Sequence, residues 1–122
     1  MPNHSPHPAA PPVPQALDRA FLALADPTRR AMVERLSQGA ASVSDLAAPF
    51  AMSLPAILQH LSVLEGAGLV ISVKKGRVRV CAVQPDALAP VTDWIAARRR
   101  EWSARLDRLA AYLDETSKDA AP

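Results

Sequence analysis

Residues 52–70 read MSLPAILQHLSVLEGAGLV, the pattern of a short helix with a capped start and a glycine-rich end. Ser53 has the hydroxyl that favours an N-cap, and Pro55 lies in the first turn, where its missing amide hydrogen costs little. Apolar side chains recur every three or four residues and predict one buried face: Leu54, Ile57, Leu61 and Leu64. The opposite face carries no charge before Glu65. Helices that meet only water normally carry Lys and Glu, so this face is typical of close approach to another molecule.

Further short helices are predicted on the N-terminal side of this stretch. Two cover residues 15–25 and 27–37, the second with a proline at its first position. Its arginines are expected at its rim: Arg29, Arg30 and Arg35. Another short helix, capped by Ser42 or Ser44, stops near Pro49. Because a tight connection joins it to the helix described above, the pair has the sequence form of a helix-turn-helix.

The pattern changes on the C-terminal side. β-Branched residues dominate residues 69–74 and 77–83, and a lysine-glycine pair between them supplies a turn, so we expect a hairpin with a cationic tip. A two-stranded hairpin is marginal alone and must lie against the helices. A last helix from Pro90 to about Glu115 carries an apolar stripe near a seven-residue repeat. It is too long for a domain of this size to cover, which favours burial against a second copy.

Length and composition limit the protein to one modest domain. The chain has 122 residues, 49% hydrophobic, 4% aromatic and a net charge of +2. Residues 1–14 hold six of the twelve prolines and are expected to form a disordered arm, with residues 117–122 as a disordered tail around a domain of residues 15–116. Neither a signal peptide nor a long apolar run is recognised, so a cytoplasmic location is expected. A single cysteine excludes an intramolecular disulfide.

The order of elements and several short motifs point to one family. The matching segments are LADPTRR (24–30), VSDLA (43–47), MS (52–53), QHL (59–61), LE (64–65), GLV (68–70) and GR (76–77). Over about residues 17–115 the chain resembles the ArsR/SmtB family of bacterial winged helix-turn-helix repressors. The resemblance implies a mainly α fold with a small β-hairpin, in the order α-α-α-α-β-β-α, and a cytoplasmic homodimer. Leu54, Pro55 and Leu58 depart from the family, which commonly has polar residues there.

The resemblance also implies which residues contact double-stranded DNA. Residues 53–65 become the recognition helix in the major groove, and residues 74–79 become the wing on the backbone or minor groove. The candidates are Ser53, Pro55, Ala56, Gln59, His60, Ser62, Lys74, Lys75, Arg77 and Arg79. The amide of Gln59 can pair with adenine, and Ser53 can meet a phosphate at the helix start. Plain alternatives remain: Ser53 as a cap only, and the wing cations as protection against edge aggregation.

The first and last helices are implied to form the dimer interface. The candidate dimerisation residues are Leu17, Phe21, Val91, Ile95, Trp102, Leu106, Leu109 and Leu113. Trp94 and Trp102 are alternatively the lining of an effector pocket, although packing is the favoured role. No small-molecule effector is identified.

No cofactor is expected, and no metal at the usual family sites. Residues 43–50 contain no cysteine, and no histidine follows His60, so the ligands of a tight zinc site are missing. His4 and His7 in the arm lack a third ligand. Cys81 shares a strand face with two arginines, which leaves a redox-responsive repressor as an alternative.

Two other function classes are weighed against a DNA-binding repressor. An enzyme is disfavoured, because we find no nucleophile-base pair, no glycine-rich phosphate loop and no paired carboxylates. The serious rival is a protein-interaction module that keeps the winged fold but binds another protein through Leu58 and Val63. The basic hairpin favours DNA. A homodimeric, sequence-specific transcriptional repressor is therefore the expected function.

Overall fold

The computed structural model describes residues 15–119, and the expected disordered arm of residues 1–14 lies outside the described residues. The chain divides into two compact units, Met1–Pro90 and Val91–Pro122, where the sequence had favoured one domain over residues 15–116. Each unit is described by itself below.

The first unit contains four short helices, and a side chain caps the start of three of them. The helices are α1 (Gln15–Leu24), α2 (Pro27–Ser37), α3 (Val43–Ala47) and α4 (Leu54–Gly66). Asp26 caps α2 by accepting a hydrogen bond from the Arg29 amide at 2.9 Å. Ser42, rather than Ser44, caps α3, and Ser53 caps α4. These side chains satisfy amides that have no partner inside the helix, so the sequence marked the helix starts well.

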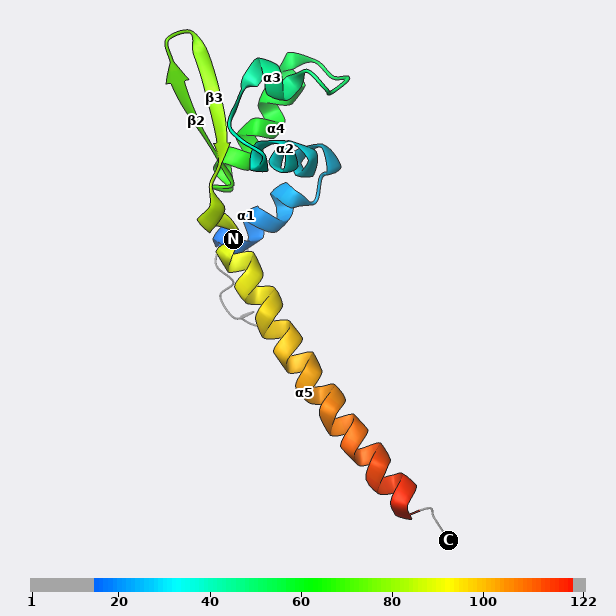
Figure 1. Cartoon of the computed structure of the whole chain (residues 1–122). Helices are drawn as coiled ribbons and strands as arrows, with labels where there is room; N and C mark the ends of the chain where they lie inside the picture. The colour runs from blue at the N-terminus through cyan, green and yellow to red at the C-terminus, as the bar shows by residue number, and fades with distance from the viewer. Residues whose placement is uncertain (1–14, 120–122) are drawn as a thin grey trace, which may run out of the picture. The chain divides into compact units, whose positions relative to one another are not determined.

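A three-stranded antiparallel sheet completes the first unit, and Figure 1 shows its hairpin, labelled β2 and β3. The predicted hairpin is formed by β2 (Val70–Lys75) and β3 (Val78–Val83), with Gly76 at φ 64° in its turn, a conformation that glycine adopts readily. A two-residue strand, β1 (Ala41–Ser42), pairs with β3 on its other side, in the order β1-β3-β2. This strand was not predicted, because two residues leave no period-two pattern. The hairpin packs beside α3 and α4, and the 3-10 turn η1 (Pro85–Leu88) follows it.

The core of the first unit lies among α2, α3, α4 and the sheet. It is built from aliphatic side chains, as the low aromatic content predicted: Ala23, Met32, Leu36, Ala41, Leu46, Ile57, Leu61, Leu64, Leu69, Val70 and Cys81. Leu54 is an exception to the predicted apolar face, since 55% of it is exposed. It is the first residue of α4, where the helix begins beyond the edge of the core.

The second unit is formed by α5 (Ala89–Asp119), a single helix of 31 residues. It ends later than the predicted Glu115, so residues 117–119 are helical where a disordered tail was expected. Its apolar stripe is largely exposed, with Trp102 at 58% and Leu106 at 64%. Among the described residues, no helix is long and apolar enough to cross a membrane.

Candidate nucleic-acid interface

Helix α4 separates its side chains cleanly into a buried and an exposed face. Ile57, Leu61 and Leu64 are completely buried. The exposed face carries polar and small apolar residues without charge: Ser53, Leu54, Pro55, Leu58, Gln59 and Ser62. Of the candidate contact residues on this helix, Ala56 and His60 are only partly exposed. The exposed face is therefore free to approach a partner closely, as the sequence predicted.

The end of α4 sets the position of the wing. The amide of Gly68 donates to the Glu65 carbonyl at 2.9 Å, and the amide of Leu69 donates to the Leu64 carbonyl at 3.0 Å. Gly68 has a left-handed backbone conformation, with φ 74°, and together with these two bonds it forms a Schellman motif. Leu64 and Leu69, which the second bond joins, are both buried. Strand β2 begins at the next residue, Val70, so the hairpin starts from a fixed direction beside α4.

His60 is turned toward the corner between α1 and α2. Its Nδ1 lies 3.3 Å from Nη1 of Arg29 and 3.9 Å from Oδ2 of Asp26. A guanidinium only donates hydrogen bonds, so we infer that Nδ1 is the acceptor and that the ring proton sits on Nε2. Because Nδ1 is already bonded to Arg29 within the subunit, this atom of His60 helps to position α4 and is not available to contact DNA.

The arginines of α2 have a structural role that sequence reasoning missed. Arg29 and Arg30 were expected to lie at the rim of α2. Instead, Arg29 donates hydrogen bonds to the carbonyls of Ala23 and Leu22. Arg30 donates one to the carbonyl of Leu24. Helix α1 has no basic residue in its own last turn. The arginines supply from α2 the donors that its terminal carbonyls need. The signal was present in the sequence as two arginines directly after a helix end, although their direction depends on the turn.

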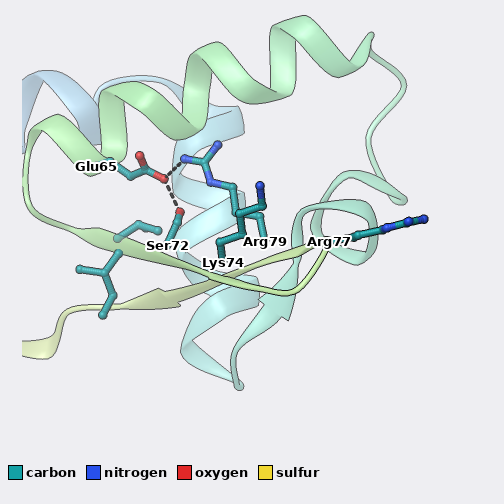
Figure 2. Close-up of a pocket in the computed structure, with 7 residues that line it drawn as sticks. Glu65, Ser72, Lys74, Arg77 and Arg79 are labelled. Atoms are coloured by element: carbon teal, nitrogen blue, oxygen red, sulfur yellow. Dashed lines mark hydrogen bonds and ion pairs between the residues drawn. The ribbon is translucent and has the colours of Figure 1, made fainter.

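The wing divides its four cations into two kinds. Lys74, Lys75 and Arg77 are exposed. Arg79 instead donates through Nη2 to Oε1 of Glu65 at 2.5 Å, and Figure 2 shows Arg79 turned toward that carboxylate while Arg77 extends away from it. An open groove of about 640 Å³ between the end of α4 and the hairpin is lined by Glu65, Arg79, Lys74 and Arg77, but not by Lys75. Glu65 was not among the predicted site residues, because its partner lies 14 positions away.

A second depression lies between the tip of the wing and the start of α4. Its volume is about 370 Å³, and its lining includes Leu54, Leu58, Val43 and Val78. Leu54 and Leu58 are residues at which the sequence departs from the family pattern, and both are exposed there. The surface between recognition helix and wing is therefore more apolar than the family resemblance implied, and apolar contact suits thymine methyl groups.

The remaining chemical candidates are not exposed on this surface. Cys81 is completely buried, with its Sγ 3.6 Å from Oγ of Ser72. A buried thiol in apolar surroundings is protected from oxidants, which favours a structural role over the redox alternative. Over residues 15–119 no three of the His, Cys, Asp and Glu side chains are grouped closely enough to hold a metal ion.

Comparison with known proteins identifies the family. The chain is 41% identical over 102 residues to the HTH-type transcriptional regulator Rv2034 of Mycobacterium tuberculosis, an alignment that covers 84% of this chain and 92% of that protein. A solved ArsR family transcriptional regulator is 46% identical, with a TM-score of 0.71, over 74% of this chain and 93% of that one. This chain belongs to the ArsR family. The predicted winged helix-turn-helix fold and the predicted DNA-binding regulatory function are thereby confirmed.

Other similarities of this ArsR-family protein cover its central region. A helix-turn-helix domain model matches residues 24–73. The transcriptional repressor SdpR of Bacillus subtilis is 29% identical over 79 residues, 65% of this chain and 88% of that protein. The homodimeric winged helix-turn-helix DNA-binding domain of Mb0332 from Mycobacterium bovis shares the fold, at 23% identity and a TM-score of 0.57 over 70% of this chain and 82% of that one.

Proposed function

We propose that this ArsR-family regulator is a homodimeric cytoplasmic repressor, without catalytic activity, that occupies a pseudo-palindromic operator. In each subunit residues 53–65 enter the major groove and residues 74–79 lie on the backbone or in the minor groove. The observation that carries this proposal is the uncharged exposed face of α4 beside three exposed cations of the wing. Duplex DNA requires both: a surface that fits a groove and positive charges for the flanking phosphates.

Helix α5 supports the dimer. Its exposed apolar side chains include Ile95, Trp102, Leu106, Leu109 and Leu113, each at least 42% exposed in the single chain. Such a stripe on a single helix is characteristic of burial against a second helix. Two recognition helices in a dimer of this kind reach half-sites about one helical turn, roughly 34 Å, apart.

The repressor role is supported by the relative SdpR, which carries that name. Repression by this protein requires that its operator overlap a promoter. The contacts to bases fall to the exposed residues of α4, with Gln59 as the main polar reader and Leu54 and Leu58 as apolar contacts to thymine methyl groups. Phosphate contacts fall to Ser53 at the helix start and to the three exposed cations of the wing, Lys74, Lys75 and Arg77.

The test is a selection of genomic fragments by the full-length protein, followed by titration of the recovered fragment. A repressor will recover fragments that share an inverted repeat, bind them as one dimer per site and lose affinity steeply with salt. Sedimentation at the same concentration will give the mass of a dimer. Recovery of fragments without a shared sequence, or no binding at low salt, would contradict the proposal and favour protein interaction through the apolar depression between α4 and the wing.

A further inference from the structure

Glu65 is an isolated acid within the proposed DNA-binding surface. It is the only Asp or Glu between residues 46 and 85, a segment that contains the four wing cations. It also lies in the last turn of α4, where the negative end of the helix dipole disfavours a carboxylate. Neither the stability of the helix nor attraction to DNA accounts for an acid at this place, so its contacts must.

The Glu65 carboxylate accepts hydrogen bonds from both strands of the hairpin. Its Oε1 accepts a hydrogen bond from Nη2 of Arg79 on β3 at 2.5 Å and another from the Ser72 hydroxyl on β2. The sheet register pairs Ser72 with Cys81 and Lys74 with Arg79, and Figure 2 shows Ser72 and Arg79 on the face of the hairpin beside α4. One carboxylate of the recognition helix therefore contacts both strands of the hairpin on the same face.

The same contact withholds a cation from DNA. The side chain of Arg79 is 41% exposed and that of Glu65 is 29% exposed, so the pair lies at the surface, where such pairs contribute little to stability. A phosphate in the groove would attract Arg79 with comparable strength. While Glu65 holds Arg79, the wing offers three unpaired cations to phosphates: Lys74, Lys75 and Arg77.

We propose that Glu65 is a specificity-determining residue, which lowers the affinity of the protein for DNA of any sequence by holding Arg79 away from the phosphate backbone. Base reading by the exposed face of α4 does not pass through this pair, so the restraint acts on non-specific binding more than on operator binding. This inference rests on the proposed DNA-binding function of the wing and α4. It assigns to Arg79 a position beside α4 in place of the phosphate contact expected from the sequence.

The experiment compares Glu65→Gln with the parent protein on a duplex of mixed sequence and on the recovered operator fragment, over a range of salt concentrations. Glutamine keeps the shape of the side chain but removes the charge that retains Arg79. The expected result is a rise of about 0.9 in the slope of log affinity against log salt, and roughly tenfold tighter binding to the mixed sequence at low salt. Operator affinity rises less, so the ratio between the two falls.

Three further variants separate this mechanism from a general effect of charge or folding. Glu101→Gln removes the same charge from a comparable surface pair, since Glu101 accepts from Arg98 at 2.9 Å on α5, and its slope is expected to equal that of the parent. Arg79→Ala is also expected to keep the parental slope, and Glu65→Gln with Arg79→Ala to return to it. Thermal unfolding of each variant shows that it is folded at the temperature of the titrations.

The outcomes distinguish this inference from the function on which it rests. A parent protein that binds no duplex DNA overturns the proposed function and the role of Glu65 with it. A parent that binds DNA, with a Glu65→Gln slope equal to its own, overturns the role of Glu65 alone. If the slope of Arg79→Ala is lower than that of the parent by about 0.9, the role of Glu65 is also overturned, because Arg79 would then contact phosphate in the parent.

Discussion

Nη1 of Arg29 lies 3.3 Å from Nδ1 of His60, and this contact joins the recognition helix to the helices that support it. The same guanidinium donates to the carbonyl of Ala23 at 2.7 Å and to that of Leu22 at 3.0 Å. One side chain of α2 therefore bonds the end of α1 and the middle of α4 together. The orientation of α4 depends on this polar contact as well as on the apolar core below it.

Replacing Arg29 with alanine is expected to lower the free energy of unfolding by roughly 1–3 kcal/mol, because two helix-terminal carbonyls and His60 lose a charged donor. The measurement is urea denaturation at a fixed protein concentration. Arg35→Ala is the matched control, since Arg35 makes one exposed bond, to the Gly39 carbonyl at 3.1 Å, and should change stability by less than about 0.5 kcal/mol. Equal effects of the two substitutions would contradict the role given to Arg29.

Asp26 is expected to make folding sensitive to acid. The hydrogen bond from the Arg29 amide lowers the pKa of Asp26 from its usual 3.8; desolvation acts in the opposite direction, and the positive charge of the Arg29 side chain lowers the pKa further. The unfolded state then binds the proton more readily, so the stabilisation is present above the usual pKa and is lost as the pH falls through the lowered one. Asp26→Asn keeps an N-cap and should show a smaller loss of stability than the parent when the pH is lowered from neutral to below the lowered pKa of Asp26. If Asp26→Asn lost as much stability in acid as the parent, this carboxylate would not be a source of the acid sensitivity.

Gln59 and His60 are neighbours with different expected effects on DNA binding. Gln59 is exposed on α4, so Gln59→Ala should remove roughly 1–3 kcal/mol of discrimination between the recovered operator and a changed sequence, at unchanged stability. His60→Ala should instead lower stability and weaken binding to both sequences alike, because it loosens α4. Competition titrations with the two duplexes make the comparison. A selective loss of discrimination in His60→Ala would show that His60 reads bases.

Leu61 and Leu58 test the division of α4 into two faces. Leu61 is fully buried and Leu58 is 37% exposed. Leu61→Ala should cost roughly 2–5 kcal/mol through lost burial and the cavity that remains. Leu58→Ala should cost about 1 kcal/mol or less, because much of its surface already meets water. Urea midpoints of the two variants measure the difference, and a larger cost at Leu58 would mean that the helix is rotated from the orientation described.

Arg77 is expected to contact phosphate, since it is exposed and extends away from Glu65 in Figure 2. Arg77→Ala should weaken binding to all duplexes similarly and reduce the slope of log affinity against log salt by about 0.9. Arg105→Ala, with the same change of charge at an exposed position of α5, should leave the slope unchanged. An Arg77→Ala slope equal to that of the parent would place the wing away from the DNA backbone.

Prediction from the sequence was accurate where the decisive interactions are local. Helices α2 and α4 begin beside the residues that the sequence indicated, because Asp26 and Ser53 cap amides within a few positions of themselves. The turn at Gly76 followed from the residue that takes a positive φ most easily. By contrast, β1 was missed, since Ala41 and Ser42 become a strand only by pairing with Cys81 and Val80 of β3.

The wing cations show the same distinction at the candidate site. Their number and place at a hairpin tip followed from local pattern, and so did the uncharged face of α4. The local pattern did not show which of the wing cations is available to DNA. An ion pair such as that of Glu65 with Arg79 depends on the packing of a strand against a helix. The final direction of a long side chain is selected among many rotamers by groups that are distant in sequence.

The amino-acid sequence by itself determined the starts of α2 and α4, the helix-turn-helix spacing and the hairpin turn, because capping, periodicity and glycine conformation act over a few residues. The family followed from the resemblance of its short motifs. Only the tertiary structure decided that Arg29 joins α1 to α4, that Glu65 engages Arg79, and that Cys81 is buried. Those outcomes require elements to be packed, since a hydrogen bond or the burial of a thiol exists only when segments separated in the chain meet at atomic distance.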